Sequence, residues 1–161
     1  GLRVIGTVSN EEKAEKAKSF GCDEIIFYRR EDVPQRVREL TGGKGVETVF
    51  DSVGKDTFEA SLKSLKRRGV LVGCGTASGP FPAIDAFQMM MQGSVYFTRP
   101  AFADYYADPE ERAELSQLWF GHLAAGRVKV EIGQRFALED CVEAHRNLES
   151  GKTIGSSIFV L

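Results

Sequence analysis

The sequence predicts an α/β fold, with a doubly wound parallel sheet covered by helices on both faces. Short apolar runs rich in β-branched residues alternate with charged segments of helical period, beginning with LRVIGTV and then EEKAEKAKSF. Glycine, proline or a capping side chain bounds each segment. Since 42% of the 161 residues are hydrophobic, we also expect a real core rather than extensive disorder.

The chain opens with two predicted strands separated by a helix. Residues 2–8 are apolar and β-branched, which is typical of a buried strand. The helix is expected to begin at a capping box in which Ser9 is the N-cap and Glu12 is the third helical residue. Gly21 ends that helix, and residues 24–28 form the second strand.

A second helix is expected to begin at Asp32, its capping residue, with Pro34 in the first turn. Residues 42–45, GGKG, lack the spacing and following hydroxyl of a phosphate-binding P-loop, so we interpret them as a helix stop. The third strand follows at residues 46–50.

The next helix is predicted to be capped by Asp56 and to carry Phe58, Leu62 and Leu65 on one side. The fourth strand spans residues 69–73 and runs into a glycine-rich turn. The remaining expected elements are a Met-rich helix at 84–92, a strand at 94–98, a helix at 108–125, a short strand near 134–138, a helix near 139–149 and a closing strand at 156–161.

Charge and cysteine content exclude several classes of function. A net charge of −2 gives no electrostatic case for binding nucleic acid or an anionic membrane. No apolar run approaches the roughly 18 residues of a spanning helix, and the N-terminus lacks the order of a signal peptide. Cys22, Cys74 and Cys141 are far apart and form no CxxC, so we expect reduced thiols of a cytoplasmic protein, packed as small buried hydrophobes.

Four motifs resemble one family: residues 6–9 (GTVS), 28–32 (YRRED), 51–54 (DSVG) and 96–100 (YFTRP), together with the ending at 149–157. The chain is similar to the C-terminal half of zinc-independent quinone oxidoreductases of the medium-chain dehydrogenase/reductase superfamily. This resemblance implies a Rossmann-like domain that lacks its first strand and glycine-rich loop, and a missing N-terminal barrel-like catalytic domain.

The resemblance also sets the expected domain organisation. Residues 1–126 are expected to be a partial dinucleotide-binding domain, and residues 127–161 a tail belonging to the catalytic domain. In the strand order 3-2-1-4-5-6 the missing strand is central. We expect its loss to leave residues 4–8 and 70–72 without their shared neighbour.

The turn after the first strand predicts NADPH rather than NADH. An NAD enzyme usually presents an acid there to the ribose 2′-hydroxyl. Here the turn is Ser9-Asn10, with Lys13 one helical turn beyond, a pair suited to a 2′-phosphate. The alternatives are that Ser9 is only an N-cap and Lys13 only a surface lysine. The resemblance adds Tyr28 to this site, although a strand-end aromatic can instead pack on a helix.

For the rest of the cofactor the resemblance implies three further segments. Ser52 lies along the cofactor, Cys74-Gly75-Thr76 faces its nicotinamide half, and Phe97-Thr98-Arg99 lies near the carboxamide. The family usually has an aromatic residue at Cys74 and Asn at Thr76, so this chain departs from it there. Asp51 has the alternative of capping the turn that follows it. Residues 93–98 form an edge strand that implies a homodimer.

The implied activity is hydride transfer from NADPH to a quinone or another electron-poor acceptor such as an enone. The alternatives are an enoyl or alkenal reductase of the same superfamily, and a fragment that binds nucleotide or dimerises without turnover. No catalytic acid or base can be named. His122 and His145 lie in predicted helices without a metal-like partner, and no cysteine–histidine cluster suits zinc.

Overall fold

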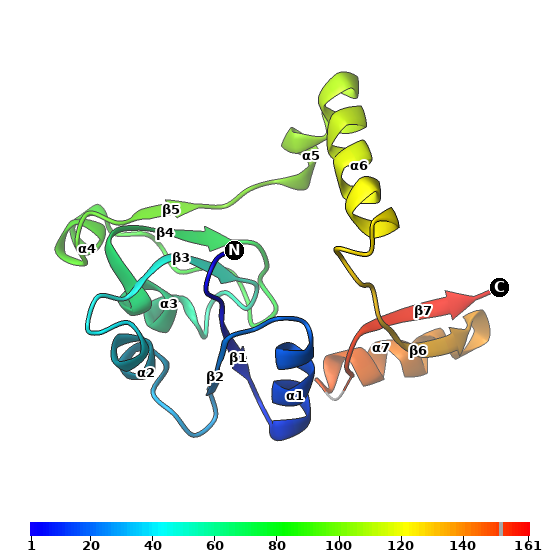
Figure 1. Ribbon diagram of the computed structural model, residues 1–161, viewed down its shortest axis with the longest axis horizontal. Coiled ribbons are helices and arrows are strands. Elements are labelled where there is room, and N and C mark those ends of the chain that lie inside the picture. Colours follow the sequence, from blue (N-terminus) through cyan, green and yellow to red (C-terminus); the bar gives the residue numbers. More distant parts are fainter. Residues whose placement is uncertain (152) are drawn as a thin grey trace. The chain divides into compact units, whose positions relative to one another are not determined.

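The computed structural model describes residues 1–151 and 153–161, and these divide into two compact units, Gly1–Phe102 and Ala103–Leu161 (Figure 1). The predicted boundary near residue 126 falls inside the second unit. Each unit contains parallel strands joined by helices, so the predicted α/β class is confirmed.

The first unit holds two parallel sheets. In one, β1 (Ile5–Val8) pairs with β2 (Glu24–Phe27), and Val8 lies opposite Phe27. The other has the order β3-β4-β5, built from β3 (Val46–Asp51), β4 (Leu65–Gly73) and β5 (Tyr96–Thr98). Because all these pairs are parallel, the carboxyl ends within each sheet meet at one edge, which is where this class of fold binds ligands.

Helices connect these strands in the predicted order. They are α1 (Glu11–Ser19), α2 (Val33–Leu40), α3 (Phe58–Ser64) and α4 (Ala86–Met91). A further short helix, α5 (Phe102–Tyr105), was not expected from the sequence. The Asp32 carboxylate caps α2 by accepting a 2.8 Å hydrogen bond from the Gln35 N–H, so that prediction is confirmed.

Two predicted helix caps are wrong, each by one residue. The side chain that caps α1 is Asn10, whose Oδ1 accepts a 2.9 Å hydrogen bond from the Lys13 N–H, so Ser9 is not the N-cap. Asp56 does not cap α3 either, because Thr57 occupies that position and makes no capping bond. Neighbouring polar residues cap almost equally well, so the local sequence could not choose between them.

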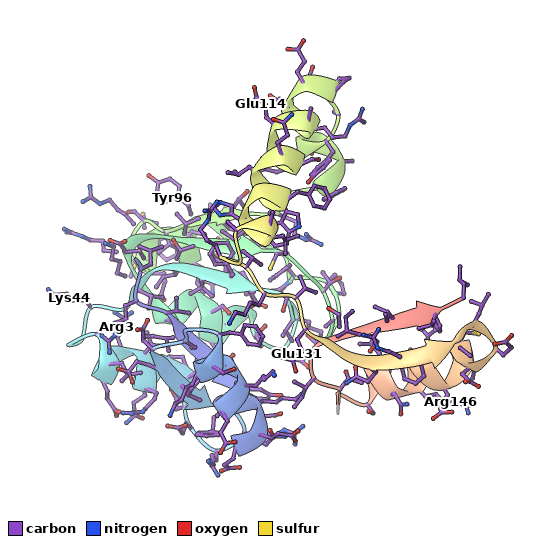
Figure 2. All side chains as sticks on the ribbon, turned by 45° about the vertical axis from the view of Figure 1, so that its right-hand side comes forward. Arg3, Lys44, Tyr96, Glu114, Glu131 and Arg146 are labelled. Carbon is purple, nitrogen blue, oxygen red and sulfur yellow. The ribbon has the colours of Figure 1, made fainter. Side chains whose placement is uncertain are left out.

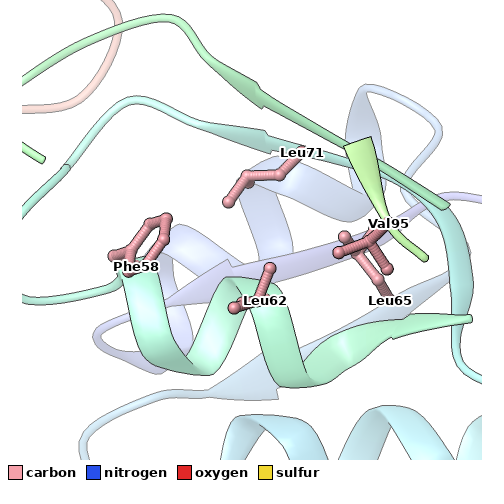
Figure 3. Packing of buried hydrophobic residues seen from close by; sticks show 5 residues of the cluster. All are labelled: Phe58, Leu62, Leu65, Leu71 and Val95. Carbon is pink, nitrogen blue, oxygen red and sulfur yellow. The ribbon is translucent and has the colours of Figure 1, made fainter. Parts of the chain in front are cut away.

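The core of the first unit lies between α3 and the β3-β4-β5 sheet. Its buried members are Phe58, Leu62, Leu65, Leu71 and Val95 (Figure 3). The predicted apolar side of the helix is confirmed for Phe58 and Leu62, whereas Leu65 lies just beyond the helix as the first residue of β4. Burial of this surface is the main term that holds the sheet and α3 together.

The inner strands β1 and β3 each have a single partner among the described residues. β4 pairs with strands on both sides, so the expectation that residues 70–72 lack a neighbour is wrong; β3 is the open strand. Sequential strands joined by a helix usually pair directly, which places β4 next to β3. In the doubly wound order, the position of the central strand lies between β1 and β3.

The exposure of side chains on β3 and next to β1 agrees with a gap in the sheet, by which we mean the strand position between β1 and β3. The side chain of Phe50 in β3 is 75% exposed, and that of Val4, just before β1, is 48% exposed. β1 also begins at Ile5 rather than at residue 2, and only Val8 of this strand is buried. The prediction of a buried strand over residues 2–8 is thus wrong in extent and in burial.

The second unit has its own parallel pair, β6 (Ile132–Ala137) and β7 (Ser156–Val160). The 3-10 helix η1 (Leu138–Asp140) and α7 (Cys141–Glu149) connect them. Before them comes α6 (Pro109–Ala124), capped by Asp108, whose Oδ1 accepts from the backbone N–H groups of residues 110 and 111. The predicted elements of the tail are therefore confirmed.

Candidate cofactor-binding edge

The carboxyl edge of β1 and β2 brings together two of the predicted phosphate-site residues. Val8 and Phe27 are paired, so Ser9 and Tyr28 are the next residues of adjacent strands. The Tyr28 N–H donates a 3.2 Å hydrogen bond to the Val8 carbonyl oxygen, which continues the pairing beyond the strands. The Tyr28 side chain is half exposed, so its ring is not buried against a helix.

Lys13 lies in the first turn of α1, directly after this edge, and its side chain is partly buried. A second cation that sequence reasoning missed lies nearby in the chain. The Arg30 guanidinium donates a 2.6 Å hydrogen bond to Glu11 and stacks 4.0 Å from the centre of the Phe27 ring. This hydrogen bond holds the pKa of Glu11 below its usual range, so the acid stays ionised and paired.

The loops that follow β3 and β4 are joined along their length. We call residues 52–57 and 74–79 the loop pair. The Ala77 N–H donates to the Ser52 carbonyl oxygen at 3.3 Å, and the Ser78 N–H donates to the Val53 carbonyl oxygen at 2.8 Å. The Lys55 N–H donates back across the pair to the Gly79 carbonyl oxygen at 3.2 Å. The structure therefore brings Ser52, Cys74, Gly75 and Thr76 together at one sheet edge.

Two glycines allow this close approach. A Cβ on Gly75 would overlap the backbone of Ser52, and one on Gly54 would overlap the carbonyl oxygen of Gly79. Gly54 also has φ +93°, a conformation that other residues rarely adopt. The backbone of the loop pair, rather than its side chains, thus sets the spacing between the two loops.

Asp51 ends β3 and is 4% exposed. Its Oδ1 accepts hydrogen bonds from the N–H groups of Val53 at 2.9 Å and Gly54 at 3.0 Å, so the predicted capping role is confirmed. Its carboxylate also accepts from the hydroxyls of Thr57 at 2.8 Å and Ser61 at 2.6 Å, which the sequence did not reveal. Burial alone would raise the pKa of Asp51, but these hydrogen bonds together hold it below its usual value.

The end of β5 places the last three predicted residues. Thr98 pairs with Val72 and is exposed. The Arg99 guanidinium donates a 3.1 Å hydrogen bond to the Gly73 carbonyl oxygen, so it lies next to the start of the loop after β4. The Phe97 ring instead packs edge-on against the Phe81 ring, with 5.3 Å between the ring centres, and both rings contact the core.

The cysteines are free, and two of them differ from expectation. Cys74 and Cys141 are exposed, so the interpretation as small buried hydrophobes is wrong for both.

Within the described ranges, no group of three or more His, Cys, Asp or Glu residues could hold a metal ion. Zinc independence stays a prediction. None of the helices in the described part of the chain is long and apolar enough to cross a membrane.

A family model described as zinc-binding dehydrogenase matches residues 1–117. The chain belongs to this family. Among curated members it is 45% identical to a quinone oxidoreductase of Salmonella typhimurium over 99% of this chain and 50% of the relative. It is also 40% identical to the 2-haloacrylate reductase of a Burkholderia species, over 99% of this chain and 48% of the relative. The chain therefore spans about half the length of these dehydrogenase relatives.

Solved structures agree with this membership. The quinone oxidoreductase of Escherichia coli, complexed with NADPH, superposes with a TM-score of 0.94 at 41% identity, covering 99% of this chain and 49% of that one. The quinone oxidoreductase of Pseudomonas syringae superposes equally well, with a TM-score of 0.94 at 40% identity and coverage of 99% and 49%. The resemblance to quinone oxidoreductases of the medium-chain superfamily, and the Rossmann-like fold, are confirmed.

Proposed function

We propose that this chain is the NADPH-binding half of an oxidoreductase that transfers hydride from NADPH to a quinone or a similarly electron-poor acceptor. The observation that carries the proposal is the edge of β1 and β2, where the strand register sets Ser9 beside Tyr28 and Lys13 follows in α1. Its support from relatives is that the Escherichia coli quinone oxidoreductase and a mycobacterial protein at 42% identity were solved with NADPH.

The residues at this edge fit a 2′-phosphate better than a free 2′-hydroxyl. The turn after β1 carries Ser9 and Asn10 rather than an acid, and the Asn10 side chain is occupied in capping α1. The nearest acid in sequence, Glu11, is paired with Arg30. Ser9 and Tyr28 would donate to the phosphate, and Lys13 would supply charge. The loop pair, with Thr98 and Arg99, would face the rest of the cofactor.

NADPH supplies the hydride, so the contribution of this chain is to bind and orient the cofactor. Ser52, Cys74 and Thr76 are exposed, so the loop pair is accessible to a ligand at the carboxyl ends of β3 and β4. We assign no catalytic acid or base to the chain. The acceptor is expected to contact residues of the catalytic domain. We assign residues 127–161 of this chain to that domain.

A second candidate is reduction of an α,β-unsaturated carbonyl compound. The chain is 40% identical to a 2-haloacrylate reductase and 28% identical to a crotonyl-CoA reductase of Streptomyces collinus. Both names describe carbon–carbon double bonds conjugated to a carboxyl or thioester group. The same NADPH site serves either acceptor, so acceptor preference in the complete enzyme separates the two activities.

We also propose a homodimer formed through the edge strand at residues 93–98. β5 ends the order β3-β4-β5, and the Tyr96 side chain is 61% exposed and projects from the surface of the first unit (Figure 2). An apolar strand edge of this kind favours pairing with another strand. Tyr96→Asp is expected to shift the protein from dimer to monomer in light scattering; an unchanged mass would contradict the dimer.

Calorimetric titration of the chain with NADPH and with NADH tests the cofactor proposal. We expect NADPH to bind more tightly than NADH. Lys13→Ala should lower the affinity for NADPH by about tenfold and change the affinity for NADH by no more than about twofold, since only NADPH carries the extra phosphate. Lys18→Ala, in the last turn of the same helix, is the matched control and should change neither affinity. Binding of neither nucleotide, or equal loss of both in Lys13→Ala, would overturn the proposal.

A further inference from the structure

The carboxylate of Asp51 joins two consecutive elements of the chain. One oxygen, Oδ1, accepts from the N–H groups of Val53 and Gly54 in the turn after β3. The Thr57 hydroxyl lies 2.8 Å from both carboxylate oxygens, and the Ser61 hydroxyl of α3 donates to Oδ2 at 2.6 Å. A single buried side chain therefore holds the turn in place against the helix.

The position of this turn determines the position of the next loop. The carbonyl oxygen of Asp51 accepts a 2.8 Å hydrogen bond from the Cys74 N–H, and those of Ser52 and Val53 accept from residues 77 and 78. The Ser78 hydroxyl adds a 2.9 Å hydrogen bond to the Val53 carbonyl oxygen and accepts from the Asp56 N–H. These hydrogen bonds join the turn directly to the loop after β4.

The loop pair faces a different half of the cofactor from the phosphate site. A doubly wound sheet binds a dinucleotide across its carboxyl edge, with one nucleotide over each half of the sheet. In the proposed function, Ser9 and Tyr28 bind the 2′-phosphate at the half formed by β1 and β2, where these two residues follow paired strand ends. The β3-β4-β5 half then lies under the second nucleotide, which carries the reactive ring.

We propose that Asp51 is a positioning residue that holds the loop pair in the arrangement required by the nicotinamide half of NADPH. The inference rests on the proposed function and deepens it. Ser52, Cys74 and Thr76 are exposed on the loop pair, whereas Asp51 is buried and offers almost no surface for a ligand to contact. Loops already held in place bind at a lower entropic cost than loops that must become ordered.

Comparison of two ligands separates this role from a general contribution to stability. Adenosine 2′,5′-bisphosphate carries only the half that binds at β1 and β2, whereas NADPH also needs the loop pair. We expect Asp51→Ala to lower the affinity for NADPH by about tenfold and to change the affinity for the bisphosphate by no more than about twofold. The reason is that the substitution frees only the loop pair, which the bisphosphate does not contact.

Conservative variants sharpen the test. Asp51→Asn should recover most of the NADPH affinity, because its amide oxygen can accept from Val53 and Gly54 while the hydroxyls of Thr57 and Ser61 rotate to accept from its NH₂ group. Ser61→Ala should show the same selective loss as Asp51→Ala in smaller degree. Ser64→Ala is the matched control, since its hydroxyl donates only to the Ala60 carbonyl oxygen of the same helix.

Each outcome decides the proposal. A selective loss of NADPH in Asp51→Ala supports it, and if that variant does not fold, the same loss in Ser61→Ala supports it. Unchanged NADPH affinity in the folded variants, or equal loss of both ligands, would show that Asp51 has a merely structural role. If the unsubstituted chain binds neither ligand, the proposed function itself fails. That failure is seen in the unsubstituted chain, whereas failure of the role given to Asp51 is seen only in its variants.

Discussion

The Arg38 guanidinium in α2 donates a 3.0 Å hydrogen bond to the carbonyl oxygen of Leu65, the first residue of β4. The same group also donates to the carbonyl oxygens of Gly43, Lys44 and Lys63. One side chain thus joins α2, the loop at residues 42–45 that follows it, and the start of β4. These hydrogen bonds help to hold residues 42–45 against α3 and β4.

Arg38→Ala is therefore expected to destabilise the first unit by about 1–3 kcal/mol, because hydrogen bonds from a charged donor are lost and carbonyl oxygens are left unpaired. Urea unfolding measures the change. Arg36→Ala on the same helix is the control, since Arg36 pairs with Glu39 and Glu31 at the surface and its loss should destabilise the unit less than the loss of Arg38. Equal effects of the two substitutions would contradict the role given to Arg38.

Asp51 makes the stability of the first unit depend on pH at the acid end. Its pKa is lower in the folded protein than its usual value, so its ionised form stabilises the fold above the unfolded-state pKa of about 3.9. This stabilisation is lost as pH falls through the folded-state pKa. We expect the difference in unfolding free energy between wild type and Asp51→Asn to narrow as pH falls below about 4.

Unfolding of both proteins in urea, at a series of pH values and constant ionic strength, gives this difference. Ser64→Ala removes a hydroxyl with no link to the Asp51 carboxylate, so its effect should stay constant across the same range. A constant difference between wild type and Asp51→Asn would mean that the hydrogen bonds to this carboxylate do not favour its ionised form.

Gly75→Ala tests the close approach within the loop pair. The added Cβ would overlap the backbone of Ser52, so the two loops must separate. We expect a loss of about 1–3 kcal/mol of stability and weaker NADPH binding. Gly121→Ala is the control, because a Cβ there meets no atom within 4 Å and should stabilise α6 by up to about 1 kcal/mol. A Gly75→Ala variant with unchanged stability would show that the loop pair is not tightly packed.

Arg30→Ala tests whether the pairing of Glu11 matters for cofactor choice. Without its 2.6 Å partner, Glu11 would present an unpaired negative charge near the proposed 2′-phosphate site. We expect NADPH affinity to fall by about three- to tenfold and NADH affinity by less than about twofold, with a smaller difference at high salt. Adding Glu11→Gln to this variant should restore NADPH binding. An equal fall for both nucleotides would contradict the prediction.

The order of strands and helices was predictable because each element leaves a local pattern. The apolar runs at β2, β3 and β4, the Asp32 cap and the side of α3 that carries Phe58 all depend on residues near one another in the chain. That Ser9 and Tyr28 follow the ends of adjacent strands was predictable for the same reason. The role of these two residues and Lys13 in binding a phosphate stays a prediction. Where neighbouring residues compete, as Ser9 and Asn10 do for the cap of α1, the sequence misled by one position.

The sequence by itself thus determined the parallel α/β class, the element order and the family, because hydrophobic period, capping residues and short motifs are local properties. Only the tertiary structure decided that β3 rather than β4 borders the gap, that Cys74 and Cys141 are exposed, and that Asp51 bonds to Ser61 of α3. Strand neighbours, burial and long-range hydrogen bonds depend on how distant segments pack, and no local pattern encodes that packing.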